Sequence, residues 1–322
     1  MLEIGFLKLS SPVILAPMSG ITDLPFRTLN RRFGCELAFV EMVNIRSLSC
    51  RNKRTLRMLA TNEFDKPLGV QIIGQDPEYI LKAMEILADF KYDILDFNAA
   101  CPAKKLIARG VGASLLKEPA KLAEILKLIV VNAKVSVTLK IRIGWDKSSI
   151  NAREIACRAQ DAGISGLFIH GRTRAQGYSG NVDYQVIKEV KAALKIPVIA
   201  SGDLWSAQFI KKMFDETGCD GVAVARGAIG NPWIFKETAQ FLKGGTIIKK
   251  PSRQEITDTM LGHLNLCTDF YGERIGVILF RKFIDWYTKG LHKTKRLREK
   301  SRFCNTKNEM MAIIEILDNI NE

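Results

Sequence analysis

Eight short apolar segments recur along the first 225 residues, and helical patterns lie between them. They are centred on residues 13–16, 37–40, 68–73, 93–97, 136–141, 166–169, 197–200 and 221–225. Near-continuous apolar strands that alternate with helices are typical of a parallel sheet covered by helices. Eight such units within about 240 residues predict a closed (β/α)8 TIM barrel rather than an open sheet. The segments between them are amphipathic: residues 77–90, for example, place Ile80, Met84 and Leu87 on one helical face.

The composition changes after Phe241. Residues 243–251 have the glycines and the proline of a linker, and strand patterns are absent from the sequence beyond it. Ser252 and Glu255 have the spacing of a capping box that begins a helix. The sequence therefore predicts a barrel domain over 1–242, a linker over 243–251, and a small all-α helical domain over 252–322. Two apolar faces are predicted there, as follows: Met260, Leu264 and Cys267, then Met310, Ile313, Ile314 and Leu317.

The chain is strongly basic, with a formal net charge of +14 over 322 residues. This charge favours a polyanionic partner, either a nucleic acid or an anionic membrane surface. No apolar run approaches the roughly 18 residues of a membrane span, and the first residues lack the charged start of a signal peptide. We expect a cytoplasmic protein with no membrane partner.

The cysteines and histidines argue against a metal site. The seven cysteines are scattered without a CxxC pair, and the chain has three histidines. Zinc sites use closely spaced Cys and His ligands, whereas scattered cysteines are typical of reduced thiols in a cytosol. We therefore expect no bound metal.

Each predicted strand ends in a distinctive residue or short group, and all of these except the first include a polar side chain. In chain order they are Pro17-Met18, Glu41, Gln71, Asn98, Lys140 with Arg142, His170, Ser201-Gly202-Asp203, and Arg226-Gly227. Active sites of such barrels lie at this end of the strands, and the loops after the last two strands commonly bind phosphate. Lys140 and Arg142, two residues apart, point to the same face and favour an anionic or electron-rich ligand. The sequence predicts a phosphorylated cofactor, with its phosphate near Gly202 and Arg226 and its ring over Met18, Gln71 and Lys140.

Asn98 and Cys101-Pro102 follow the fourth strand, and a basic segment comes after them. Pro102 cannot continue the strand because it lacks an N–H, and Gly110 and Gly112 permit a loop that moves or approaches a ligand closely. Lys104, Lys105 and Arg109 could contact phosphates beside the cysteine. A buried cysteine next to a solvated basic loop is the alternative.

Residues 281–302 hold nine Lys/Arg against two acids, with Phe283, Trp286 and Tyr287 among them. Cations interleaved with aromatic residues are typical of an RNA-binding face. The alternative is a solvated helix with buried aromatic side chains. A second basic cluster, residues 46–57, has five Lys/Arg and no acid.

Several motifs together resemble those of the tRNA-dihydrouridine synthases, and most closely the bacterial B-type branch. They are LAPMSGITDLPFR (15–27), NAACPAKK (98–105), KIRIGW (140–145), HGRTRAQGYSG (170–180), SGDLWS (201–206) and ARGAIGNPWIF (225–235). They cover most of the barrel in the family's order. Three residues depart from the family's pattern: Ala100 stands where the family has Gly, Ser201 where Asn is frequent, and Ala225 where Gly is usual.

The resemblance implies FMN as cofactor and NADPH, or NADH, as electron donor. The reduced flavin would pass a hydride from N5 to C6 of a tRNA uracil, and Cys101 would donate a proton to C5. A thiol suits this role because it is mostly protonated at neutral pH and can still transfer its proton. The target base must leave its stack to reach the barrel. The flavin-binding residues implied are Ala16, Pro17, Met18, Gln71, Lys140, His170, Ser201, Gly202, Asp203, Ala225 and Arg226. The residues expected to bind uracil or tRNA are Asn98, Lys104, Lys105, Arg109, Arg142, Arg281, Lys293, Lys295, Arg296 and Arg298.

The B-type resemblance implies a uridine at position 17 of the D loop as the target, and we expect a monomer. Two other functions stay open at this point. An FMN barrel that reduces a free pyrimidine would leave the basic helical domain unexplained. A non-catalytic tRNA-binding protein on a decayed enzyme scaffold would not need Cys101, Lys140 and His170.

Overall fold

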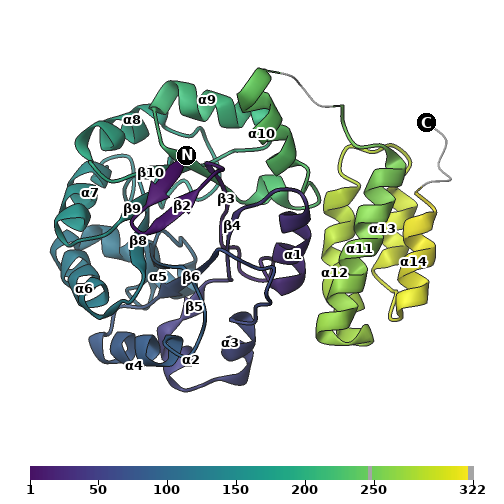
Figure 1. The fold of residues 1–322 in the computed structure, drawn as a ribbon, viewed down its shortest axis with the longest axis horizontal. Helices are drawn as coiled ribbons and strands as arrows, with labels where there is room; N and C mark the ends of the chain where they lie inside the picture. The colour runs from purple at the N-terminus through teal and green to yellow at the C-terminus, as the bar shows by residue number, and fades with distance from the viewer. Residues whose placement is uncertain (246–248, 318–322) are drawn as a thin grey trace.

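The computed structural model describes residues 1–245 and 249–317, and its centre is a closed parallel barrel (Figure 1). Its strands are β3 (Val13–Leu15), β4 (Leu37–Phe39), β6 (Leu68–Ile73), β7 (Ile94–Ala99), β8 (Ser136–Arg142), β9 (Gly166–His170), β10 (Val198–Ser201) and β11 (Gly221–Val224). They are hydrogen-bonded in the order β4-β3-β11-β10-β9-β8-β7-β6, and a β4–β6 pairing closes the ring. The predicted (β/α)8 barrel is confirmed.

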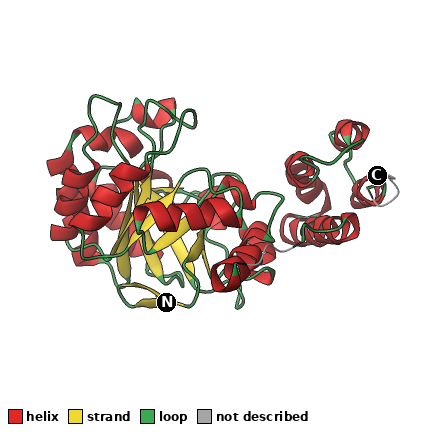
Figure 2. Ribbon diagram, turned by 90° about the horizontal axis from the view of Figure 1, so that it is seen from above, coloured by secondary structure: helices red, strands yellow, loops and turns green. Residues whose placement is uncertain are grey.

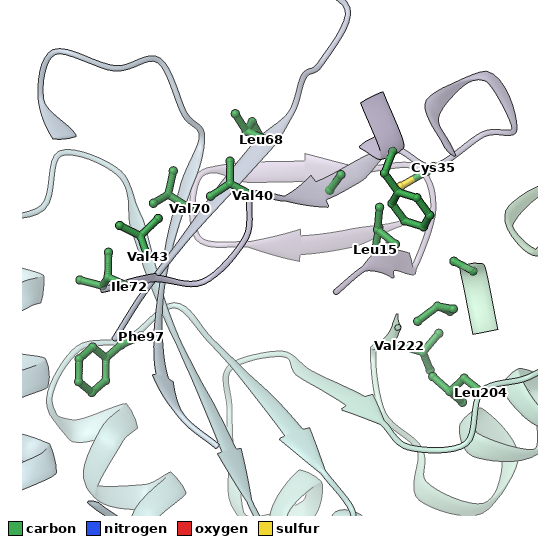
Figure 3. Close-up of a cluster of buried hydrophobic side chains, with 14 of the residues drawn as sticks. Leu15, Cys35, Val40, Val43, Leu68, Val70, Ile72, Phe97, Leu204 and Val222 are labelled. Atoms are coloured by element: carbon green, nitrogen blue, oxygen red, sulfur yellow. The ribbon is translucent and has the colours of Figure 1, made fainter. Parts of the chain in front are cut away.

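Apolar side chains on the outer face of the strands attach the barrel to its helices. Leu15, Val70, Ile72, Phe97 and Val222 are among the buried side chains of this layer (Figure 3). Strands covered on both faces need apolar residues at nearly every position, which is why these segments appear as continuous apolar runs.

Helices surround the barrel in Figure 1, and Figure 2 shows the strands from the side with helices flanking them. They are α1 (Leu24–Arg32), α4 (Pro77–Leu87), α6 (Pro119–Asn132), α7 (Ala152–Asp161), α8 (Tyr184–Ala193), α9 (Ala207–Thr217) and α10 (Ile234–Gly244). The predicted inner face of α4 is confirmed, because Ile80, Met84 and Leu87 are all buried.

The amino-terminal end of the barrel is closed by a hairpin that the sequence did not reveal. Strands β1 (Leu2–Ile4) and β2 (Leu7–Leu9) pair antiparallel, and Ile4 is buried with Phe39 and Phe168 inside the barrel. Two three-residue strands are too short to give a periodic signal. Apolar residues therefore fill this end, which leaves the opposite end for polar groups.

Two connections contain short elements of their own. The second strand is followed by β5 (Val43–Asn44), α2 (Ile45–Ser49) and α3 (Lys53–Met58), and β7 is followed by α5 (Lys104–Ile107) and the 3-10 helix η1 (Gly112–Lys117). The segment after Cys101, expected as an irregular loop, is thus largely helical. Gly110 and Gly112 have φ values of 72° and 66°, and a Cβ at Gly112 would lie 2.8 Å from the Cys101 carbonyl oxygen. Gly112 therefore permits a close approach to the backbone of Cys101.

Helices α11 (Arg253–Tyr271), α12 (Glu273–Tyr287), α13 (Lys295–Ser301) and α14 (Lys307–Glu315) follow the barrel. The Ser252–Glu255 capping box is confirmed. Of the two predicted apolar faces, all members are buried except Ile313, which is half-buried. The predicted linker begins inside α10, which continues to Gly244, and residues 246–248 and 318–322 of the predicted linker and helical domain lie outside the described residues. The domain boundaries stay a prediction.

The four helices pack against the barrel through α1 (Figure 1). The ring of Phe26 on α1 stacks on Phe283 of α12 with centroids 5.7 Å apart. The Tyr271 hydroxyl donates to Asp23 at 3.0 Å, and the Lys282 ammonium donates to the Gly20 carbonyl. Removing the helices would therefore expose apolar barrel surface around Phe26.

Candidate active site

A cavity of about 400 Å³ opens at the carboxyl end of the barrel strands. All eleven residues expected to bind the cofactor line it, together with Asn98, Cys101 and Arg142. They come from the carboxyl ends of β3 and of β6 through β11, and from the loops that follow these strands. Convergence of separate strand ends on one cavity is the usual construction of a barrel active site.

The floor of this cavity is polar on the side formed by β6, β7 and β8. Side chains two residues apart on a strand share a face, so Asp96 and Asn98 both point into the barrel above Ile94. Gln71, Asp96 and Thr138 are direct partners in the strand register. Each of these three side chains is at most 1% exposed. Buried polar groups at this level need hydrogen-bond partners, and they find them in one another.

Cys101 is held in a turn that Asn98 organises. The Asn98 Oδ1 accepts hydrogen bonds from the backbone N–H groups of Ala100 and Cys101, both at 2.9 Å. The Cys101 carbonyl accepts from the Ala113 N–H at 3.1 Å. Ala100 is not among the residues with positive φ, so alanine fits here without backbone strain. The turn presents Cys101, which is half-buried, at the cavity wall.

Arg142 joins two loops beneath the cavity. Its Nε donates to the Ala100 carbonyl at 2.8 Å, and its Nη1 donates to the carbonyls of Thr173 and Gly177 at 2.9 and 2.7 Å. Burial lowers the pKa of this guanidinium below its ordinary value, although an arginine stays charged in proteins. Arg142 thus fixes the Cys101 turn to the loop after β9, in addition to lining the cavity.

Lys140 and His170 are two titratable side chains that line the cavity, and their surroundings lower the pKa of each. Burial lowers the pKa of Lys140, and the nearby Asp96 carboxylate acts in the opposite direction. Burial, followed by the charges of Arg142 and Lys140, holds the pKa of His170 well below its usual range, so the imidazole is neutral at pH 7. The buried His170 Nε2 has no hydrogen-bond partner among the described residues. A buried nitrogen without a partner is costly and favours a ligand at this position.

An ion pair organises the end of the cavity formed by β10 and β11. The carboxylate of Asp203, which has φ of 51°, accepts from both terminal nitrogens of the buried Arg172. Arg226, at the start of the 3-10 helix η2 (Arg226–Ala228), lies 3.6 Å from the same carboxylate. Gly202 packs closely against Val182, since a Cβ at position 202 would lie 2.7 Å from the Val182 Cγ2. Arg172 was part of a recognised motif but was not predicted as a site residue.

Tyr178 and Trp205 also line the cavity and were missed. Tyr178 is 59% exposed, and its ring lies 4.6 Å from the Arg226 guanidinium. Trp205 stands 5.0 Å from the same guanidinium. Both residues are in loops, where periodicity gives no signal, and only their place within the quoted motifs could have indicated them.

The cations predicted to contact tRNA near the active site are exposed. Lys104 and Lys105 on α5, and Arg109 after it, have exposed side chains beside Cys101. The five cations of the 46–57 cluster are exposed as well, on α2, α3 and their connection. These two groups form the basic surface on the β4 and β7 connections of the barrel.

The predicted tRNA-binding cations of the basic segment 281–302 fall into two groups in the structure: some are exposed, and others donate hydrogen bonds within the helical domain. Lys293, Lys295 and Arg296 have exposed side chains. Arg281 instead donates to the Cys304 carbonyl at 2.6 and 2.9 Å. Arg298 donates to the Thr288 carbonyl and hydroxyl at 2.8 and 2.9 Å. The last two guanidinium groups therefore connect helices within the domain.

The aromatic residues of this segment are mainly core residues. Phe283 is 1% exposed and Tyr287 is 3% exposed, so their expected place on an RNA-binding face is wrong. Their rings are needed between α11, α12 and the barrel, where Phe283 stacks on Phe26. Trp286 is half-buried and lines a second cavity of about 490 Å³ with Lys289. That cavity shares Trp205 and Arg226 with the first one.

Among residues 1–245 and 249–317, no three His, Cys, Asp or Glu side chains are grouped so as to hold a metal ion. No helix in the described part of the chain is both long enough and apolar enough to cross a membrane.

Comparison with known proteins agrees with the motifs. The dihydrouridine synthase (Dus) family model matches residues 14–321. The chain is 39% identical to tRNA-dihydrouridine synthase B of Xanthomonas axonopodis pv. citri, over 97% of this chain and 94% of that protein. It is 40% identical to tRNA-dihydrouridine synthase B of Pseudomonas aeruginosa, over 92% and 89%.

The solved structures add a likeness of fold alone. Morphinone reductase aligns with a TM-score of 0.54 at 14% identity, over 79% of this chain and 92% of that one. Histamine dehydrogenase from Rhizobium sp. 4-9 aligns with a TM-score of 0.58 at 13% identity, over 82% and 50%. The family match over nearly the whole chain, together with relatives near 40% identity, shows that this protein belongs to the dihydrouridine synthase family.

Proposed function

We propose that this protein is an FMN-dependent tRNA-dihydrouridine synthase that reduces a D-loop uridine, at position 17, with electrons from NADPH or NADH. The observation that carries the proposal is the cavity at the barrel mouth, where all eleven expected flavin-binding residues meet Asn98 and Cys101. The names of the B-type relatives support tRNA as the substrate.

The residues present fit FMN. The His170 Nε2 is buried without a partner among the described residues, as expected for a nitrogen that hydrogen-bonds a bound ring. In the same described part of the chain the Lys140 ammonium has no hydrogen bond or ion pair, so its charge is available to an electron-rich ligand. Arg226 and the backbone around Gly202 lie together at the β10–β11 end of the cavity. Loops after these two strands are the usual phosphate site of such barrels.

When bound, FMN supplies the hydride that is transferred to C6 of the uracil. Cys101 holds the proton that C5 requires, in a turn fixed by the Asn98 Oδ1. A positioned general acid contributes roughly 10²- to 10⁴-fold to a rate. Lys140 stabilises negative charge that develops in the cavity. Arg142 keeps the Cys101 turn and the loop after β9 together through three carbonyls.

The exposed cations favour tRNA over a free pyrimidine. Lys104, Lys105 and Arg109 stand beside Cys101, where a free base would not require them. The second cavity, between the barrel and α12, borders the first through Trp205 and Arg226. A polyanion that delivers one base into the barrel can contact both regions, because phosphate contacts position an RNA while the target base is read separately.

The test is a single turnover in the absence of oxygen. The purified protein should carry a flavin spectrum and release FMN on denaturation, and NADPH should bleach it. Unmodified tRNA should then restore the oxidised spectrum and gain dihydrouridine at position 17, while free uracil and UMP should not restore it. Reoxidation by UMP as fast as by tRNA would favour the free-pyrimidine enzyme. Protein that cannot be loaded with FMN would contradict the proposal.

A further inference from the structure

Asp96 is a buried carboxylate that the proposed reaction does not use. It lies in the middle of β7, is 1% exposed, and points into the barrel below Asn98. Its Oδ2 accepts from the Gln71 Nε2 at 2.7 Å, and its Oδ1 accepts from the Thr138 hydroxyl at 2.7 Å. An acid in this position is costly to bury, so its presence points to a role beyond packing.

The hydrogen bonds that begin at Asp96 form a chain with one direction. The Gln71 Oε1 accepts from the Asn98 Nδ2 at 2.8 Å. The Asn98 Oδ1 accepts from the backbone N–H groups of Ala100 and Cys101. An amide has one donor end and one acceptor end, whereas an ionised carboxylate only accepts. Asp96 therefore attracts the NH2 of Gln71, which turns the Gln71 oxygen toward Asn98. Asn98 in turn directs its own oxygen toward the Cys101 turn.

We propose that Asp96 is a positioning residue that sets the orientation of the Gln71 and Asn98 amides and thereby holds the turn that presents Cys101. Its importance for catalysis rests on the proposed function of Cys101, but the positioning itself does not. The register supports it, since Gln71 and Asp96 are direct partners on neighbouring strands and Asn98 follows on the same face. Burial raises the pKa of Asp96 to about 6, while the hydrogen bonds from Gln71 and Thr138 and the charge of Lys140 act to lower it. The carboxyl group is therefore mostly ionised at pH 7.5, where it accepts from both neighbours.

Reversing the chain of hydrogen bonds provides a sharp test. In Asn98→Asp, the new carboxylate still accepts from the Cys101 turn, but its other oxygen faces the Gln71 oxygen. Adding Asp96→Asn removes this conflict, because the amide introduced at position 96 can donate to the Gln71 oxygen. The Gln71 amide can then donate to the carboxylate introduced at position 98. All groups are satisfied again with the opposite direction, so the double variant should be better ordered at Cys101 than Asn98→Asp alone.

The readouts do not depend on turnover. We would measure, at pH 7.5 without tRNA, the alkylation rate of Cys101 by iodoacetamide, followed by mass spectrometry of its peptide, and the melting temperature. Asn98→Asp should change the alkylation rate at least fivefold and lower the melting temperature, and the double variant should restore both at least halfway. Asp93→Asn is the matched control: Asp93 accepts from the Leu68 N–H at the other end of the same strand region. It should lower the melting temperature without changing the alkylation of Cys101 by more than about twofold.

The proposal would be overturned if the double variant showed the same changes in Cys101 alkylation and melting temperature as Asn98→Asp alone. It would also be overturned if the effects of the two single substitutions added. If Asn98→Asp alone does not fold and the double variant does, the rescue is seen directly. If neither variant folds, the single variant Asp96→Asn tests the proposal. The amide at position 96 can present either its oxygen or its NH2 to Gln71, so it no longer fixes the orientation of the Gln71 amide. This variant should change Cys101 alkylation at least threefold and slow the tRNA-dependent reoxidation of the flavin about 10- to 100-fold, as expected for a misplaced reacting group. An unchanged alkylation rate in Asp96→Asn would overturn the proposal. Failure of the proposed function would appear separately, as wild-type protein that tRNA does not reoxidise.

Discussion

The barrel mouth and the basic segment 281–302 both contain closely spaced cations, but the structure uses them differently. At the mouth, Lys140 and Arg142 project from one strand into the cavity, where burial lowers the pKa of each. In the helical segment, Lys295 and Arg296 stand in solvent while Arg298, two residues on, is bonded to the end of α12. A barrel strand fixes direction by alternation, whereas a short surface helix distributes its side chains between solvent and its neighbours. Cations of a strand end can therefore be assigned to a site from sequence, and those of such a helix cannot.

Removal of the Cys101 thiol should give the largest effect, because the mouth holds the reacting group. In Cys101→Ala, tRNA-dependent reoxidation of the flavin should slow by roughly 10²- to 10⁴-fold, while reduction by NADPH and the affinity for tRNA are kept. Stopped-flow absorbance separates these steps. Cys50→Ala, which removes an exposed cysteine at the end of α2, is the control. Unchanged reoxidation in Cys101→Ala would mean that another group supplies the proton.

Arg298 and Arg296 should contribute differently to the stability of the protein, although both lie in the basic segment 281–302. Arg298→Gln should lower the free energy of unfolding by about 1.5–3 kcal/mol, because charge-assisted hydrogen bonds to the buried Thr288 are lost. Arg296→Gln, at an exposed position, should stay within about 0.5 kcal/mol. Denaturant titration measures both. If the two variants lose equal stability, the division of the segment described above is wrong.

Acid should weaken the attachment of the helices to the barrel through His263. Burial lowers the pKa of His263 to about 3, below its unfolded value of about 6.5. Its contribution to stability is therefore fully present above pH 6.5 and is lost as the pH falls toward 3, with a loss of about 2 kcal/mol at pH 5. His263→Gln should flatten this dependence in unfolding titrations between pH 7 and 5. If His263→Gln leaves the pH dependence of the free energy of unfolding unchanged, other groups cause the acid sensitivity.

Asp96 at the mouth should act in the opposite direction. Its folded pKa of about 6 exceeds the unfolded value of about 3.9, so the native state binds more protons between pH 6 and 4. Lowering the pH from 7 to 5 should thus stabilise the barrel by about 1 kcal/mol through this group. Asp96→Asn should lose this gain and become more sensitive to acid than the wild type, in the same titrations.

Neutralising the exposed cations should have the smallest effect. The variant Lys293→Gln, Lys295→Gln and Arg296→Gln should bind tRNA about fivefold more weakly, and the slope of log K against log salt should become shallower by about 2. Filter binding at several salt concentrations measures both quantities. The control for net charge removes three exposed cations from helices α8 and α9 of the barrel, in the variant Lys188→Gln, Lys211→Gln and Lys212→Gln. If the triple variant keeps the wild-type affinity and slope, the segment is a solvated helix without a role in binding.

The sequence by itself determined the barrel and most of its mouth. The apolar runs predict the eight strands, and the alternation of side chains across a strand predicts which residues share a face. The residues at the eight strand ends could be identified from these two patterns alone. The family motifs extended the choice to the eleven residues that line the cavity. Residues in loops escaped this reasoning: Tyr178 and Trp205 enter the cavity from connections without periodicity. The hairpin β1–β2 escaped because its strands are three residues long.

Only the tertiary structure decided what the buried and basic side chains contact. Asp96 is one more polar residue in an apolar run until the register of three strands places Gln71 and Thr138 on either side of it. Phe283 and Tyr287 belong to the core because α12 faces α1 and α11, which their own sequence does not specify. Arg298 lies in the same basic stretch as Arg296, but the end of α12 offers it a carbonyl and a hydroxyl. Pattern reports which face a residue occupies, whereas a hydrogen-bond partner depends on how distant segments meet.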